Sequence, residues 1–185
     1  MSYGELHEQQ RKALVPYVTG KEVVDLGAGD LKLSHELVRL GATVVHAIDK
    51  ERMPTPLVPT VKTIQKTFAK YATRFPDGAV VFLSWPPNHE LPELRQLLRR
   101  ADVVIYLGKN TDGRMCGTPT LFRHFLTRRL DEYVPHENNA LIVYGPEMRL
   151  KRAPVGEEFA ALKIYEEPDR IYGFEEVEAK CAPSF

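Results

Sequence analysis

Short apolar runs alternate with amphipathic stretches along most of this chain, and this alternation restricts its fold more than any other feature. Runs such as 79–83, with no polar position, are typical of strands covered on both faces of a parallel sheet. Strand, helix and strand in repeated succession build a parallel sheet with helices on both faces. The predicted strands are 22–26, 43–48, 61–64, 79–83, 103–107 and 141–144, and the predicted helices are 6–18, 33–40, 68–75, 91–100 and 121–130.

The sequence therefore predicts a doubly wound α/β fold with a mostly parallel, seven-stranded sheet. We expect its seventh strand within 162–174. A chain of 185 residues has the length of a single domain, so we expect one domain over 1–185.

Composition excludes several classes of protein. Basic and acidic residues number 25 each, so net charge cannot hold this chain on nucleic acid. No apolar run approaches the ~20 residues of a membrane span, and the polar N-terminus is unlike a secretory signal. The two cysteines, Cys116 and Cys181, are too few for a disulfide framework or a zinc site. We therefore expect a cytoplasmic protein without a bound metal.

A glycine-containing loop follows the first predicted strand, at the sheet edge where doubly wound folds bind ligands. Its residues Gly27 and Gly29 allow a tight turn and let a ligand approach the backbone. Asp49 ends the second predicted strand, where a carboxylate can accept hydrogen bonds from both hydroxyls of a ribose. Together these features predict a site for an adenosine-containing cofactor.

The charges around the loop indicate which cofactor this is. A dinucleotide site would have glycine at position 32, where this chain has Lys32, and would place a pyrophosphate beside Asp30. Carboxylates next to a pyrophosphate repel it. S-adenosylmethionine instead carries a sulfonium and an ammonium on its methionine arm, which suit acidic neighbours. The sequence thus favours S-adenosylmethionine over NAD.

The segment 23–29, then Asp49 and the order of elements to about residue 108, resembles the class I S-adenosylmethionine-dependent methyltransferases. The resemblance implies an N-terminal helix (1–20), a cofactor-binding half (21–108) and a substrate-side half (109–185). It also implies that the loop after the fourth strand lines the methyl-transfer site. The expected cofactor-binding residues are Asp25, Gly27, Ala28, Gly29, Asp49 and Lys50.

The chain departs from the family pattern at two positions near the cofactor. Leu31 stands where the family often has a third glycine. The acidic residue that often follows strand three and contacts adenine is absent, and Gln65 or Thr67 could provide a neutral contact instead.

A third departure concerns the expected catalytic residues, Ser84 and Trp85, in the segment Ser84-Trp85-Pro86-Pro87. Methyltransferases that act on amino groups often carry Asn or Asp at the position of Trp85. Indole is only a donor and cannot accept the hydrogen bonds of a target NH2 group. Trp85 could stack on the substrate, or fill a hydrophobic corner while the prolines stiffen the loop. His35 and His89 are less favoured as general bases.

Several alternatives for function and partner stay open. The methyl acceptor could be a small molecule, a nucleic acid or a protein, and the loop 108–117 after strand five is expected to contact it. A basic helix face of Arg123, His124, Arg128 and Arg129 could meet nucleic acid, although a solvated face is favoured. The altered Ser84-Trp85 pair also allows a methyltransferase-like binding or structural protein without turnover.

Overall fold

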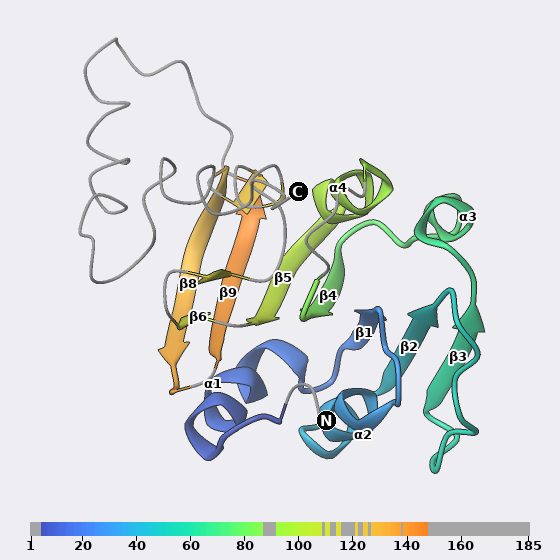
Figure 1. The fold of residues 1–185 in the computed structure, drawn as a ribbon, viewed down its shortest axis with the longest axis horizontal. Coiled ribbons are helices and arrows are strands. Elements are labelled where there is room, and N and C mark those ends of the chain that lie inside the picture. The colour runs from blue at the N-terminus through green and yellow to red at the C-terminus, as the bar shows by residue number, and fades with distance from the viewer. Residues whose placement is uncertain are drawn as a thin grey trace, which may run out of the picture.

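Seven strands of this chain form a single sheet (Figure 1). The computed structural model describes residues 5–86, 92–108, 110–111, 114–115, 121, 124–125, 127–137 and 139–147. The sheet contains β1 (Glu22–Leu26), β2 (Val44–Asp49), β3 (Val61–Gln65), β4 (Ala79–Ser84), β5 (Ala101–Gly108), β8 (Arg128–Pro135) and β9 (Ala140–Glu147). The helices are α1 (Glu8–Val18), α2 (Lys32–Arg39), α3 (Phe68–Ala72) and α4 (Pro92–Arg99).

The strand order is β3-β2-β1-β4-β5-β9-β8, and the five strands from β3 to β5 are parallel. The chain first moves outward from β1 to β2 and β3, then returns through α3 to β4 on the other side of β1. Strand β9 runs antiparallel to both β5 and β8. The predicted doubly wound, mostly parallel sheet is therefore confirmed.

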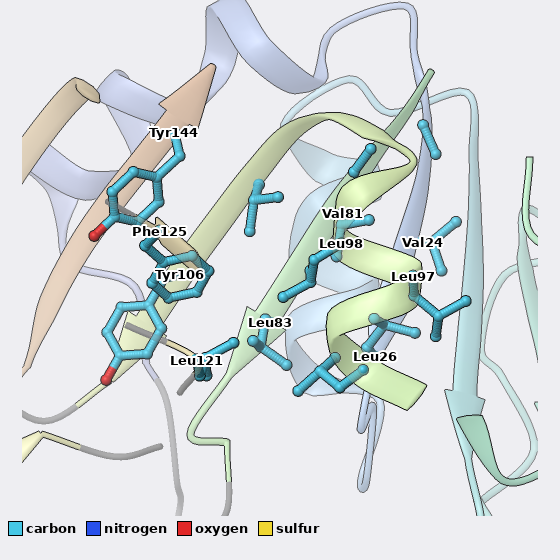
Figure 2. Close-up of a cluster of buried hydrophobic side chains, with 14 of the residues drawn as sticks. Val24, Leu26, Val81, Leu83, Leu97, Leu98, Tyr106, Leu121, Phe125 and Tyr144 are labelled. Carbon is cyan, nitrogen blue, oxygen red and sulfur yellow. The ribbon is translucent and has the colours of Figure 1, made fainter. Parts of the chain in front are cut away.

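Two apolar layers, one on each face of the sheet, follow from the alternation of side chains along its strands. On one face, Val24 and Leu26 of β1 pack under α3 and α4, together with the residues labelled in Figure 2. On the other face, Val23 packs with leucines of α1 and α2. In the described part of the chain, no helix has the length and apolar composition that crossing a membrane requires.

The structure corrects the prediction of a helix over 121–130. Leu121, His124 and Phe125 are helical, but Arg128, Arg129 and Leu130 belong to β8, the edge strand of the sheet. Strand β8 thus completes the seven strands, and the predicted strand within 162–174 lies outside the described residues. The basic helix face is also wrong, because the side chain of Arg128 is buried rather than solvated.

Arg128 connects three elements at the end of the sheet. Its Nε donates to the carbonyl oxygen of Gly145 (2.8 Å), and its Nη1 donates to that of Leu98 (3.0 Å). Its Nη2 donates to the carbonyl oxygens of Ala101 (2.6 Å) and Asp102 (3.0 Å). The end of α4, the start of β5 and β9 are therefore joined by one guanidinium.

We expect Arg128→Leu to lower the free energy of unfolding by about 3 kcal/mol or more, because buried carbonyl groups lose their donors. Urea unfolding measures the change. Arg99→Leu is the control, since Arg99 is exposed near the end of α4, so its replacement should cost less than about 1 kcal/mol. Equal effects of the two substitutions would contradict the structural role given to Arg128.

Candidate active site

A cleft opens where the direction of strand addition reverses, between the carboxyl ends of β1 and β4. These strands pair in parallel, with Leu26 opposite Leu83, so the loops that follow them begin side by side. The cleft has a volume of about 540 Å3. Its lining residues are Gly27, Ala28, Gly29, Asp30, Leu33, Ser84 and Trp85. The structure thus brings the predicted glycine loop and the predicted Ser84-Trp85 pair together around one cavity.

The glycine loop is held against the end of β2 by backbone hydrogen bonds. The N–H groups of Gly27 and Ala28 both donate to the carbonyl oxygen of Ile48, at 2.8 and 3.1 Å. Gly27 has a φ of +81°, and a Cβ atom at this position would meet no other atom within 4 Å. The packing of the protein would therefore leave room for a side chain at this position. Because Gly27 has none, the space beside its backbone stays open.

Leu31 occupies the position of the missing third glycine and keeps a glycine-like backbone, with a φ of +66°. Left-handed backbone costs a residue with a side chain roughly 1–2 kcal/mol. The Leu31 side chain is fully buried in the layer between the sheet and α2, which offsets about this amount. Leu31 therefore keeps a left-handed backbone of the kind that glycine adopts readily.

Asp25 lies behind the glycine loop, completely buried on the α2 side of β1. Its Oδ2 accepts a hydrogen bond from the Ser34 hydroxyl at 2.6 Å, and its Oδ1 has no hydrogen-bond partner among the described residues. Burial raises the pKa of Asp25, the Ser34 hydrogen bond lowers it, and the negative charges of Asp49 and Asp30 raise it, which together bring it to about 7. Asp25 does not line the cleft, so it can act on a ligand there only through the loop.

Asp30 already occupies the place where a dinucleotide pyrophosphate would bind. Its Oδ1 accepts a hydrogen bond from the backbone N–H of Lys32, the first residue of α2, at 3.2 Å. Helix N-termini bind anions through such N–H groups. Asp30 also pairs with the Lys32 ammonium at 3.3 Å, but both side chains are exposed and the pair is weak. The geometry therefore disfavours NAD in this cleft.

Asp49 supports the glycine loop in the described structure. Its Oδ2 accepts the N–H of Gly29 at 3.0 Å, and its Oδ1 accepts the N–H of Glu51 at 2.9 Å. Each carboxylate oxygen can accept more than one hydrogen bond, so both retain capacity for a ligand. Neither Asp49 nor Lys50 lines the cleft, and the Lys50 side chain lies 4.0 Å from Glu51 on the surface.

The two candidates for an adenine contact also lie apart from the cleft lining. Gln65 ends β3 with an exposed side chain, and Thr67 caps α3 by accepting the N–H of Lys70 at 3.4 Å. Asp49 and this segment are nevertheless joined, because the Lys66 N–H donates to the Asp49 carbonyl oxygen at 2.8 Å. The structure thus places the ends of β2 and β3 next to each other without assigning either side chain to adenine.

Ser84 and Trp85 form the wall of the cleft opposite the glycine loop. Trp85 has a φ of +47°, and its backbone N–H donates to the carbonyl oxygen of Leu107 at 2.7 Å. A large side chain in left-handed backbone is uncommon and concentrates at functional sites. Pro87, His89 and the loop positions 109, 112–113 and 116–117 lie outside the described residues, and Asn110–Thr111 (β6) pairs with Arg114–Met115 (β7).

Two residues of the site were not predicted as such from the sequence. Leu33 was expected only as a core residue of the second helix, yet it lines the cleft. Ser34 holds the buried carboxylate of Asp25, and no sequence signal separates it from an ordinary helical serine. Among the described residues, no group of His, Cys, Asp and Glu side chains gathers as metal ligands would.

Comparison with known proteins identifies the fold but no close relative. No protein-family model matches the sequence, and no curated protein matches it significantly. A protein from Listeria monocytogenes, assigned as an S-adenosylmethionine-dependent methyltransferase, is 18% identical and aligns over 76% of this chain and 97% of its own, with a TM-score of 0.56.

Two further solved structures are similar. The 1,6-didemethyltoxoflavin-N1-methyltransferase of Burkholderia thailandensis, solved with S-adenosylhomocysteine, is 14% identical over 75% of this chain and 78% of its own, with a TM-score of 0.54. The ribosomal protein L11 methylase of Lactobacillus delbrueckii subsp. bulgaricus is 14% identical over 80% and 82%, with a TM-score of 0.51. At these identities the likeness establishes the fold, which is that of the class I methyltransferases.

The raised pKa of Asp25 predicts a pH dependence of stability. The folded protein keeps the Asp25 proton up to about pH 7, whereas the unfolded chain loses it near pH 4. The stability contributed by the neutral form is therefore lost as pH rises between these values, by about 1.4 kcal/mol per pH unit. We expect Asp25→Asn to remove about 2 kcal/mol of the loss between pH 5 and pH 8, measured by urea unfolding. Identical pH profiles for the two proteins would show that Asp25 is already ionised at pH 5.

Proposed function

We propose that this protein is an S-adenosylmethionine-dependent methyltransferase that binds its cofactor in the cleft between the glycine loop and Trp85. The observation that carries the proposal is the open, glycine-floored cleft at the strand-order reversal, with acidic residues around its loop. Its volume falls in the range of small-molecule sites. The fold shared with structures such as the S-adenosylhomocysteine complex of the Burkholderia enzyme supports the same assignment.

In this proposal the loop residues divide the binding of the cofactor between them. Gly27, Ala28 and Gly29 let the methionine arm approach the backbone. Asp49 holds the ribose through the hydrogen-bonding capacity left on its oxygens, while it continues to support Gly29. Asp30 and Asp49 supply a negative potential that favours the sulfonium and the ammonium. Asp25, whose pKa is raised to about 7 mainly by burial, adds to this potential only as it ionises above that pH. The exposed Lys50 would contact the cofactor from just beyond the end of β2.

S-adenosylmethionine supplies a methyl group that is already activated on sulfur. The protein therefore has to hold the acceptor in line with this group and exclude water. Ser84 and Trp85 stand on the wall that faces the cofactor loop. The Ser84 hydroxyl can accept a hydrogen bond from the acceptor, and the Trp85 ring can stack on it. The left-handed backbone of Trp85 sets the direction of this ring.

A second candidate is a methyltransferase-like protein that binds S-adenosylmethionine without turnover. The specific observation in its favour is that Trp85 replaces the acceptor side chain found in amino-directed enzymes. Indole cannot accept the hydrogen bonds that this side chain accepts. Both candidates require the same cofactor cleft and differ only in the reaction.

We expect wild-type protein to bind S-adenosylhomocysteine in calorimetry and not to bind NAD. Gly27→Leu should abolish this binding, because a side chain would enter the open space beside the loop. Gly20→Leu is the matched control. Gly20 has a similar φ of +70° and equally open space where a Cβ atom would stand, but it does not line the cleft. The two variants therefore carry the same backbone strain, and only Gly27→Leu should lose the cofactor. Equal affinities would place the cofactor elsewhere.

Turnover separates the two candidates. Transfer of labelled methyl groups from S-adenosylmethionine to small molecules, RNA and protein in a cell extract should be seen with wild-type protein. Trp85→Ala should lower this transfer more than tenfold while S-adenosylhomocysteine affinity changes less than threefold, because stacking acts on the acceptor. Ser84→Ala, nearly isosteric, should lower transfer at unchanged stability. Full activity of Ser84→Ala, with simple destabilisation of Trp85→Ala, would remove both residues from the reaction.

A further inference from the structure

A second cavity lies against α1 and α2 and adjoins the candidate cofactor cleft at Leu33. It has a volume of about 400 Å3, and the side chain of Leu33 lines both cavities. Its walls come from the segment before α1, from α1, from α2 and from the connection between β2 and β3. The lining residues are Glu5, Leu6, Arg11, Lys32, Leu33, His35, Glu36, Arg39 and Leu57.

The polar part of this cavity is built around two guanidinium groups. Arg11 of α1 and Arg39 of α2 both contact the Glu36 carboxylate, at 2.6 and 3.2 Å. One carboxylate therefore holds two cations from different helices close together. Each guanidinium has five N–H donors, and a single contact to Glu36 leaves most of them for other acceptors. The three basic and two acidic side chains that line the cavity give it a formal charge of +1.

The apolar part of the cavity combines buried and exposed groups. Leu6 and Leu33 are buried, whereas Leu57 at the rim is 82% exposed. The backbone N–H of Leu57 donates to Nε2 of His35 at 3.0 Å, so the backbone at Leu57 is attached to α2 at the rim of the cavity. An exposed apolar side chain at the rim of a charged cavity would be covered by a ligand that has both an apolar body and an anionic group.

We propose that this second cavity binds the anionic end of the methyl acceptor, whose reacting end extends past Leu33 to Ser84 and Trp85 in the first cleft. The acceptor is then a small organic anion, a phosphate monoester or a carboxylate with an apolar body. This proposal rests on the proposed function, because it places acceptor and cofactor in adjoining cavities that share Leu33. Arg11 and Arg39 would bind the anionic group with the donors that Glu36 leaves, and Leu57 would cover the apolar body. A small molecule is favoured over a nucleic acid because the cavity is compact and the net charge of the chain is zero.

Binding of phenyl phosphate tests the proposal, with phenol as the neutral probe and titration followed by NMR. We expect phenyl phosphate to bind and phenol to bind at least fivefold more weakly. Arg11→Gln and Arg39→Gln should each weaken phenyl phosphate about fivefold or more, because charge-assisted hydrogen bonds are lost. Arg95→Gln, on the exposed face of α4, is the matched control and should change nothing. Benzoate in place of phenyl phosphate distinguishes a carboxylate acceptor from a phosphate one.

Glu36→Gln should change the affinity for phenyl phosphate in the opposite direction to the arginine variants. A merely structural role of Glu36 would not produce this change. This substitution removes the anion that competes for both guanidiniums, so phenyl phosphate should bind more tightly, by about threefold or more. Melting temperatures of all variants show whether each is folded. Unchanged or weaker binding in folded Glu36→Gln would overturn the proposal, as would unchanged binding in both arginine variants.

Measurements with S-adenosylhomocysteine and with an oligonucleotide complete the test. Saturating S-adenosylhomocysteine should not weaken phenyl phosphate binding, because the two cavities are separate. Competition between them, or loss of S-adenosylhomocysteine affinity in the arginine variants, would assign the cavity to the cofactor. Loss of affinity for single-stranded RNA alone in those variants would assign it to nucleic acid. If wild-type protein fails to bind S-adenosylhomocysteine while the phenyl phosphate pattern holds, the anion site stands and the proposed methyl transfer fails.

Discussion

The parallel pairing of β1 with β4 is the constraint on which the candidate site depends. The chain reaches β4 only after it has added β2 and β3 on the other side of β1. The loops after β1 and β4 therefore begin side by side but continue toward opposite sides of the sheet. A cleft forms between them because no connection crosses this point. The glycine loop and Trp85 face each other across it although they lie far apart in the sequence.

Electrostatics gives the two adjoining cavities opposite character. Around the first, the carboxylates of Asp30 and Asp49 accept hydrogen bonds from backbone N–H groups, and Asp30 also pairs weakly with the exposed Lys32. Asp25, whose pKa is raised to about 7 mainly by burial, adds negative charge only above that pH. Around the second, Arg11 and Arg39 share a single carboxylate and keep an excess of positive charge. In our proposal, the negatively charged surroundings of the first cavity suit a cationic cofactor, and the positively charged second cavity suits an anionic methyl acceptor. The difference in charge would keep each ligand in its own cavity.

The sequence predicted the fold of the parallel part of the sheet well because local signals and tertiary packing agree there. Strands β1 to β5, the loop at Gly27 and the end of β2 at Asp49 all lie where periodicity and glycine placement indicated. The predicted helix over 121–130 was wrong at 128–130, because the helical spacing of apolar residues continues to Leu130 although these residues belong to β8. The sequence predicts a solvated Arg128 because the adjacent residues are polar. In the structure its side chain is buried and donates to carbonyl groups of α4, β5 and β9.

The sequence by itself thus determined the alternation of strands and helices, the open glycine loop and the acidic character of its surroundings, since each depends on residues close together in the chain. Only the tertiary structure decided that β9 lies between β5 and β8, that Asp25 is buried against Ser34, and that Arg11 and Arg39 meet at Glu36. These features depend on contacts between segments that the chain brings together only when the sheet is assembled. Burial and charge proximity arise at that stage, and no local pattern encodes them.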